Sequence, residues 1–203
     1  MQKGKNKFFI LFFLLLNSSC FSQSTCIKSG VYDNFLYLGY DFSSKSISGY
    51  IDYSPYEEDK ESVQITCKLF FHGKVNSCDS NSIAVYQITD TIISYKGFIS
   101  FHNDTLKLKV INNVPSCTAV VDFNSKGTAN FVLAKAREFK NFRIIRGKTK
   151  IFLRQDDHSQ TNKYLIRGDI VDVLKVNGQW ALIKFYSSKV VQGWVKIDNL
   201  LNL

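Results

Sequence analysis

The side chains of this chain that could take part in chemistry are cysteines, histidines and neighbouring carboxylates. The histidines are His72, His102 and His158. They are isolated, and no HExxH or HxH pattern groups them as metal ligands. The residues after Cys78 stand in the wrong order for a cysteine peptidase, and there is no GxSxG serine elbow. Adjacent carboxylates at Asp156 and Asp157 do not supply the fixed separation across a cleft that glycoside hydrolysis requires. We therefore expect a non-catalytic protein with no metal and no cofactor.

Four cysteines follow residue 22, namely Cys26, Cys67, Cys78 and Cys117. An even number is typical of disulfides in exported proteins, and four cysteines allow three connectivities. A two-residue turn at His72-Gly73 would place Cys67 directly opposite Cys78, within reach of a disulfide. Cys26 would then pair with Cys117. The alternative is a metal site formed by His72 with Cys67, Cys78 and Cys117, but no CxxC spacing supports it.

The first 22 residues have the pattern of a signal peptide. Lysines at positions 3, 5 and 7 precede an apolar run from Phe8 to Leu16, and small residues follow it up to Ser22. The apolar run is far shorter than the roughly 20 residues that span a bilayer, which argues against an uncleaved anchor. Cleavage after Ser22 predicts an exported protein. The alternative is a lipoprotein anchored at Cys20, although Asn17 stands where lipoprotein signals prefer Leu.

The positive charge of the chain is concentrated in its last third. Residues 23–137 hold 11 basic and 11 acidic side chains, whereas residues 138–203 hold 12 basic and 6 acidic ones. Many of the basic residues lie between Lys135 and Arg167. A basic surface on an exported protein favours wall polymers, anionic headgroups or acidic proteins over nucleic acid, and a solvated face is the plain alternative.

Residues 23–137 are expected to form an antiparallel β-sandwich or small barrel, followed by a linker over residues 138–147. The β-branched and aromatic runs are Gly30–Tyr40, Ser46–Tyr53, Val63–Phe71, Ile83–Ile88, Thr91–Tyr95, Phe98–Phe101, Thr105–Ile111, Cys117–Phe123 and Thr128–Leu133. Only Ala134–Phe142 has helical propensity, and it could equally extend the strand before it. Aromatic residues are dense between positions 32 and 56, which fits either core packing or a ligand pocket.

Residues 148–203 contain three spaced motifs: Arg167-Gly168-Asp169, Asn177-Gly178-Gln179-Trp180 and Gly193-Trp194-Val195. Asn-Gly is a strong hairpin signal because a type I′ turn needs positive φ at both central positions. This pattern resembles the bacterial SH3-type (SH3b) domain, a small barrel of exported proteins. The resemblance implies a C-terminal SH3-like barrel over residues 148–203, so the whole chain is expected to be all-β. The first strand departs from the family pattern because it has Ile151 and Phe152 in place of small residues.

The resemblance also implies a ligand groove beside the first long loop, with Trp180 at its edge. The neighbours expected there are Arg154, Asp156, Asp157, Tyr164 and Tyr186. An aromatic wall with a few charges suits an extended peptide. We therefore expect an exported binding protein that contacts peptidoglycan peptide or another cell-envelope protein. The alternative is a wall hydrolase or hydrolase inhibitor whose activity resides in the N-terminal domain.

Overall fold

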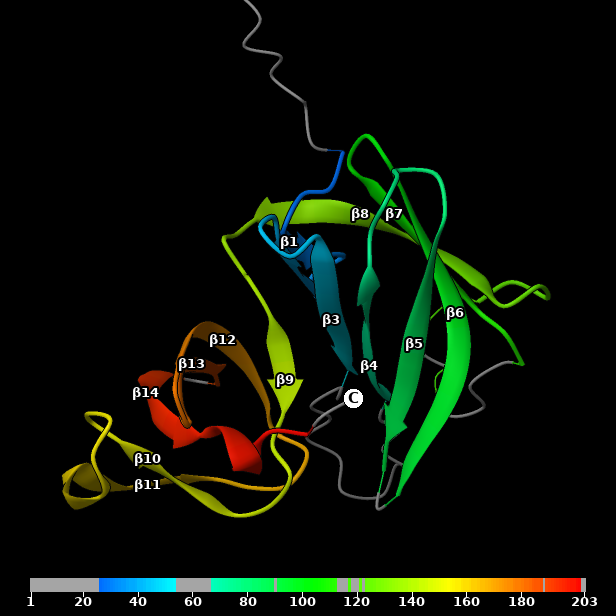
Figure 1. The fold of residues 1–203 in the computed structure, drawn as a ribbon. Coiled ribbons are helices and arrows are strands. Elements are labelled where there is room, and N and C mark those ends of the chain that lie inside the picture. Colours follow the sequence, from blue (N-terminus) through cyan, green and yellow to red (C-terminus); the bar gives the residue numbers. More distant parts are fainter. Residues whose placement is uncertain are drawn as a thin grey trace, which may run out of the picture.

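The described part of the protein is all-β and forms two sheets, of which the first is a closed barrel (Figure 1). The computed structural model describes residues 26–53, 67–89, 91–112, 117, 121, 123–187 and 189–201. The predicted signal peptide over residues 1–22 and Cys20 lie outside these residues. No helix among them is long and apolar enough to cross a membrane.

Eight antiparallel strands form the first barrel, each paired with its neighbour in the sequence, and β8 closes it against β1. The strands are β1 (Gly30–Tyr32), β2 (Leu36–Asp41), β3 (Ser46–Tyr53), β4 (Cys67–Lys74), β5 (Asn81–Ile88), β6 (Ile92–His102), β7 (Thr105–Val110) and β8 (Thr128–Ala136). Consecutive pairing follows from the short turns between β-branched and aromatic runs. Of the two architectures predicted for this part of the chain, the barrel is the one observed.

Several predicted strands have different limits. The run Gly30–Tyr40 is divided into β1 and β2 because Asp33 and Asn34 adopt positive φ angles of 45° and 65° in a turn. Thr91–Tyr95 and Phe98–Phe101 belong to one strand, β6. The described residues within Cys117–Phe123 lie in no strand. Ala134–Phe142 is not a helix, since β8 continues to Ala136.

The interior of the barrel is filled by apolar side chains that alternate along the strands. In β7, for example, Leu106 and Leu108 are fully buried while Lys107 and Lys109 are exposed. Phe71 and Phe131 are among the largest buried side chains of this core. The barrel is therefore a packed core and not a hollow container.

The second sheet has six strands in the order β11-β10-β14-β13-β12-β9. Their limits are β9 (Phe142–Ile144), β10 (Thr149–Phe152), β11 (Gln160–Leu165), β12 (Ile170–Asn177), β13 (Trp180–Tyr186) and β14 (Val190–Lys196), with short 3-10 helices η1 (Asp157–Ser159) and η2 (Ile197–Asn199). Its own core is aliphatic and includes Ile151, Val171, Ile183 and Val195.

The hairpin between β12 and β13 is formed one residue later than the Asn-Gly signal predicts. Asn177 pairs with Trp180, so the two turn residues are Gly178 and Gln179. Only Gly178 has a positive φ, of 56°. A bulge between Val173 and Lys175 shifts the register of this hairpin.

A third cluster of buried side chains joins the two sheets. It comprises Tyr50, Phe70, Phe139, Phe142, Ile144 and Ile170. Strand β9 lies between β3 of the barrel and the second sheet (Figure 1). The segment 138–147, predicted as a linker, thus contains a strand that pairs with β12 and the buried residues Phe139 and Phe142. The two sheets pack against each other through an apolar junction.

The disulfides connect Cys26 with Cys78 and Cys67 with Cys117. The predicted pairs Cys67–Cys78 and Cys26–Cys117 are wrong. The predicted turn at His72-Gly73 lies inside β4, which runs to Lys74 and places His72 opposite Ala84. Because the loop to β5 comes later, Cys67 and Cys78 are not opposed across the hairpin. Two disulfides are compatible with an exported protein.

Candidate functional site

The six predicted ligand-binding residues lie in three separate places. Trp180 starts β13, and the loop 153–159 that contains Arg154, Asp156 and Asp157 lies beside it. Tyr164 is on the edge strand β11, and Tyr186 is at the junction between the sheets. The structure therefore brings Trp180 and the loop together but separates the two tyrosines from them.

Trp180 is buried, with 6% of its surface exposed, although it was expected at the edge of a groove. Its ring meets Phe152 edge to face at 5.0 Å between centroids. The ammonium group of Lys196 lies 5.2 Å from the centre of the indole ring, close enough for a cation–π contact. The indole of Trp180 is thus packed within the sheet, and the ammonium group of Lys196 lies over its ring.

The loop 153–159 is fastened beside Trp180 by side-chain contacts at two points. The carboxylate of Asp157 lies 2.7 Å from the ammonium group of Lys196, and the amide of Asn177 donates a 2.7 Å hydrogen bond to Gln155. Within the loop, the hydroxyl of Ser159 donates to the carbonyl groups of Arg154 and Asp156 at 3.0 and 2.7 Å. The loop is therefore internally ordered, whereas its outer contacts are exposed and weak.

A row of apolar side chains continues from Trp180 across the same face of the sheet. Leu182 and Trp194 are paired across β13 and β14, and Trp194 is also paired with Phe152 of β10. Residues that pair directly share one face, so these side chains lie side by side. Trp194 is half-buried, and Leu153 at the start of the loop is 72% exposed. We call Phe152, Trp180, Leu182 and Trp194 the aromatic face, and Leu153 follows Phe152 at the start of the loop.

The two tyrosines have other partners. Tyr164 is exposed and lies under the ammonium group of Lys148, 4.7 Å from the ring centre. It stands opposite Lys150, so this edge of the sheet is basic. Tyr186 packs edge to face on Phe139 at 5.3 Å, and burial raises the pKa of its hydroxyl. Tyr186 is therefore part of the junction and not of the aromatic face.

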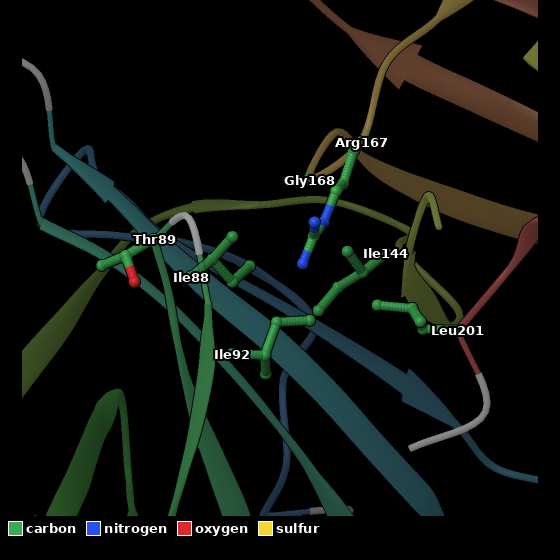
Figure 2. Close-up of a pocket in the computed structure, with 7 residues that line it drawn as sticks. All are labelled: Ile88, Thr89, Ile92, Ile144, Arg167, Gly168 and Leu201. Carbon is green, nitrogen blue, oxygen red and sulfur yellow. The ribbon is translucent and has the colours of Figure 1, made fainter. Parts of the chain in front are cut away.

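A pocket of about 280 Å³ lies between the two sheets (Figure 2). The barrel contributes Ile88, Thr89 and Ile92, and the second sheet contributes Ile144, Arg167, Gly168 and Leu201. Figure 2 shows the guanidinium group of Arg167 reaching toward the isoleucine side chains. The pocket thus combines four aliphatic side chains with one cationic group.

One ionisable group, Asp172 of β12, is buried in the junction with no exposed surface. One carboxylate oxygen accepts 3.1 Å hydrogen bonds from the backbone amides of Lys140 and Asn141. The other oxygen has no hydrogen-bond partner among the described residues. Burial raises the pKa of this carboxyl group, and the two amide hydrogen bonds partly oppose the shift.

The histidines remain isolated from one another, as their sequence positions suggest. His72 stacks on Tyr86 at 5.6 Å, and burial, followed by the charge of Arg143, lowers its pKa. Among the described residues, no group of three or more His, Cys, Asp or Glu side chains could hold a metal ion. The three cysteines of the alternative metal-site hypothesis, Cys67, Cys78 and Cys117, are all in disulfides.

Comparison with known proteins gives no relative for this chain. No family model, no curated protein and no solved structure matches it.

Sequence reasoning missed the pocket between the sheets. Arg167 and Gly168 were noticed only as part of a fold motif, and nothing local connects them with Ile88 or Ile92 in the other sheet. The glycine at position 168 is the one local signal: its φ is 87°, which glycine adopts freely, and a Cβ added there would lie 3.5 Å from the side chain of Ile88. Pocket residues so far apart in the sequence can be connected only from the arrangement of the two sheets in the structure.

Proposed function

We propose that this protein is an exported, non-catalytic binding protein. In this proposal the second sheet is an SH3b-like barrel that contacts peptidoglycan peptide or another protein of the cell envelope. Residues 1–22 act as its export signal, with the lipoprotein anchor at Cys20 as the alternative. The four cysteines that form the two disulfides are consistent with an oxidising compartment.

The observation that carries the proposal is the loop 153–159 fastened beside the aromatic face. This surface combines a half-buried Trp194, an exposed Leu153 and charged neighbours. Such a surface fits an extended peptide, because apolar side chains of the peptide can pack on it while its charged groups pair with the neighbouring charges. Contact of this kind depends on a few central aromatic anchors surrounded by polar residues. The loop supplies these polar residues through Arg154, Asp156 and Asp157.

The basic edge of the second sheet supports an anionic partner. Lys148, Lys150 and Lys163 surround Tyr164 on β10 and β11, within the basic segment 135–167. Such a surface attracts wall polymers by long-range electrostatics and so favours encounter with the wall. The filled interior of the barrel favours the second sheet as the contact surface over the hydrolase or inhibitor alternative.

The test is retention on purified peptidoglycan. Because Trp180 is buried, the informative variant changes exposed positions, Leu153→Ser with Arg154→Ala. Val132→Ser with Lys135→Ala on β8 is the matched control, since it removes the same kinds of exposed side chain. We expect the first variant to lose at least about fivefold in affinity and the control to retain it. Retention that is absent, or equal in both variants, contradicts the proposal.

A further inference from the structure

The pocket between the two sheets has the composition of a binding site. Its walls are the side chains of Ile88, Ile92, Ile144 and Leu201, and its charged group is Arg167 (Figure 2). Ligand sites in proteins are commonly apolar clefts at the meeting of two structural units with few polar groups. The aromatic face of the second sheet contributes none of these residues.

The charge of Arg167 is not neutralised by the described part of the chain. No carboxylate there lies within ion-pair distance of its guanidinium group. The nearest carboxylate in sequence, Asp169, is already engaged, because it accepts a 2.8 Å hydrogen bond from the amide of Ile166. A guanidinium group presents parallel N–H donors that match a carboxylate with two hydrogen bonds.

Arg167 is held by a rigid turn. The amide of Asp169 donates to the carbonyl of Ile166 at 3.2 Å, and the amide of Gly168 donates to the carbonyl of Ile145 at 2.9 Å. Gly168 is buried against Ile88, with the positive φ that glycine adopts freely. The turn thus fixes the backbone that carries the exposed side chain of Arg167 beside the pocket, which lowers part of the entropic cost of binding.

We propose that this pocket binds a carboxylate that carries a short aliphatic group, such as the C-terminus of a peptide whose last residue is small and aliphatic. The carboxylate pairs with Arg167, and the terminal methyl group lies among the isoleucine side chains. The hydroxyl of Thr89 is bonded to Thr91 and the amide of Gly168 to Ile145, so the guanidinium group of Arg167 supplies the polar recognition. About 280 Å³ accommodates one or two small residues. The proposal does not rest on the aromatic face, because the two sites share no residue.

The test is a titration of the full mature chain, measured by isothermal titration calorimetry. The probes are N-acetyl-alanylalanine, the same dipeptide with a C-terminal amide, and hexanoate. Arg167→Gln removes the charge at similar length, and Arg146→Gln is the matched control because Arg146 is an exposed arginine of the same sheet that does not line the pocket. Circular dichroism verifies that both variants fold.

We expect the dipeptide acid to bind at least about tenfold more tightly than its amide, and Arg167→Gln to lose a similar factor, because hydrogen bonds to a charged group are involved. Arg146→Gln should bind like the wild type. Equal affinity for acid and amide, no loss in Arg167→Gln, or no binding of any probe overturns the proposal. Tighter binding of hexanoate than of the dipeptide identifies an alkyl carboxylate as the ligand, and tighter binding of the dipeptide identifies a peptide C-terminus.

Discussion

The backbone amide of Phe142 donates a 2.6 Å hydrogen bond to the hydroxyl group of Ser48, across 94 residues of sequence. Ser48 lies on β3 of the barrel, and Phe142 begins β9 of the second sheet. Both residues are buried. This bond and the surrounding aromatic cluster attach the second sheet to the barrel, and they place the two walls of the Arg167 pocket opposite each other.

Removal of the Ser48 hydroxyl should therefore weaken the junction. Ser48→Ala leaves the buried amide of Phe142 without an acceptor, and we expect a loss of about 1–3 kcal/mol in the free energy of unfolding. Urea denaturation measures it. A loss below a few tenths of a kcal/mol would show that the junction does not depend on this bond.

The packing of Phe142 should make the two sheets unfold together. Both tryptophans of the chain, Trp180 and Trp194, lie in the second sheet, so their fluorescence reports on that sheet alone. In the wild type we expect the urea transition by fluorescence to coincide with that by circular dichroism. Phe142→Ala should cost about 3–5 kcal/mol and separate the two transitions. Transitions that already differ in the wild type would argue against a cooperative junction.

The disulfide connectivity can be read directly. Proteolysis without reduction, followed by mass spectrometry, should release peptides that link Cys26 to Cys78 and Cys67 to Cys117. Each bond closes a loop of roughly 50 residues, for which loop entropy gives about 4 kcal/mol of stabilisation. Reduction should therefore lower the urea midpoint strongly. A peptide linking Cys67 to Cys78 would disprove this strand register.

Asp172 should make stability depend on pH. Burial raises the pKa of Asp172 in the fold above the ordinary value of about 3.9, so the protonated form is favoured in the folded state. Its favourable contribution is complete below the unfolded pKa and is lost as pH rises through the raised folded pKa.

Asp172→Asn removes this titration while its amide oxygen still accepts from the amides of Lys140 and Asn141. The stability of the variant relative to the wild type should therefore increase from pH 3.5 upward and then level off. Lys140 and Lys184 face this carboxyl group and oppose the shift. The measurement is urea unfolding at a series of pH values. A relative stability that is flat with pH would contradict the raised pKa.

The loss of Trp180 and the loss of the Asp157–Lys196 ion pair beside it should have different effects on stability. Trp180→Ala empties a buried site and should cost about 3–5 kcal/mol. Asp157→Ala removes only the exposed pair with Lys196 and should cost at most about 1 kcal/mol. Thermal unfolding compares the two variants. A similar cost for both would mean that the loop, and not the packing of the indole, stabilises this corner of the sheet.

Local patterns in the sequence predicted where most of the strands lie, but they did not predict how the strands pair. Runs of β-branched and aromatic residues predicted β3 and β7 closely, although β3 is buried on both faces and only β7 alternates buried with exposed residues. The cysteine pairing failed because β4 continues through His72 and Gly73, and a glycine inside a strand looks like a turn when read alone. At Asn177-Gly178 the turn lies one residue later than predicted, in a hairpin whose register changes at a bulge between Val173 and Lys175.

The candidate site was predictable only where its residues are near in sequence or belong to a motif. Trp180 was predicted at the edge of a groove, yet it is buried under Lys196, which depends on β14 and on the loop 153–159. Tyr186 was assigned to the groove, but the packing of Phe139 from the segment before β9 places it at the junction. Both outcomes result from contacts between segments that no local pattern links.

The most direct test of the proposed function is an NMR titration. The isotope-labelled mature protein is titrated with a soluble peptidoglycan stem peptide. The two indole N–H signals, from Trp180 and Trp194, report on the aromatic face. One Trp194→Phe variant is enough to assign them. We predict saturable shifts of the Trp194 indole and of backbone signals in the loop 153–159. No shift at millimolar peptide, or shifts confined to the barrel strands β1–β8, would contradict binding through the second sheet.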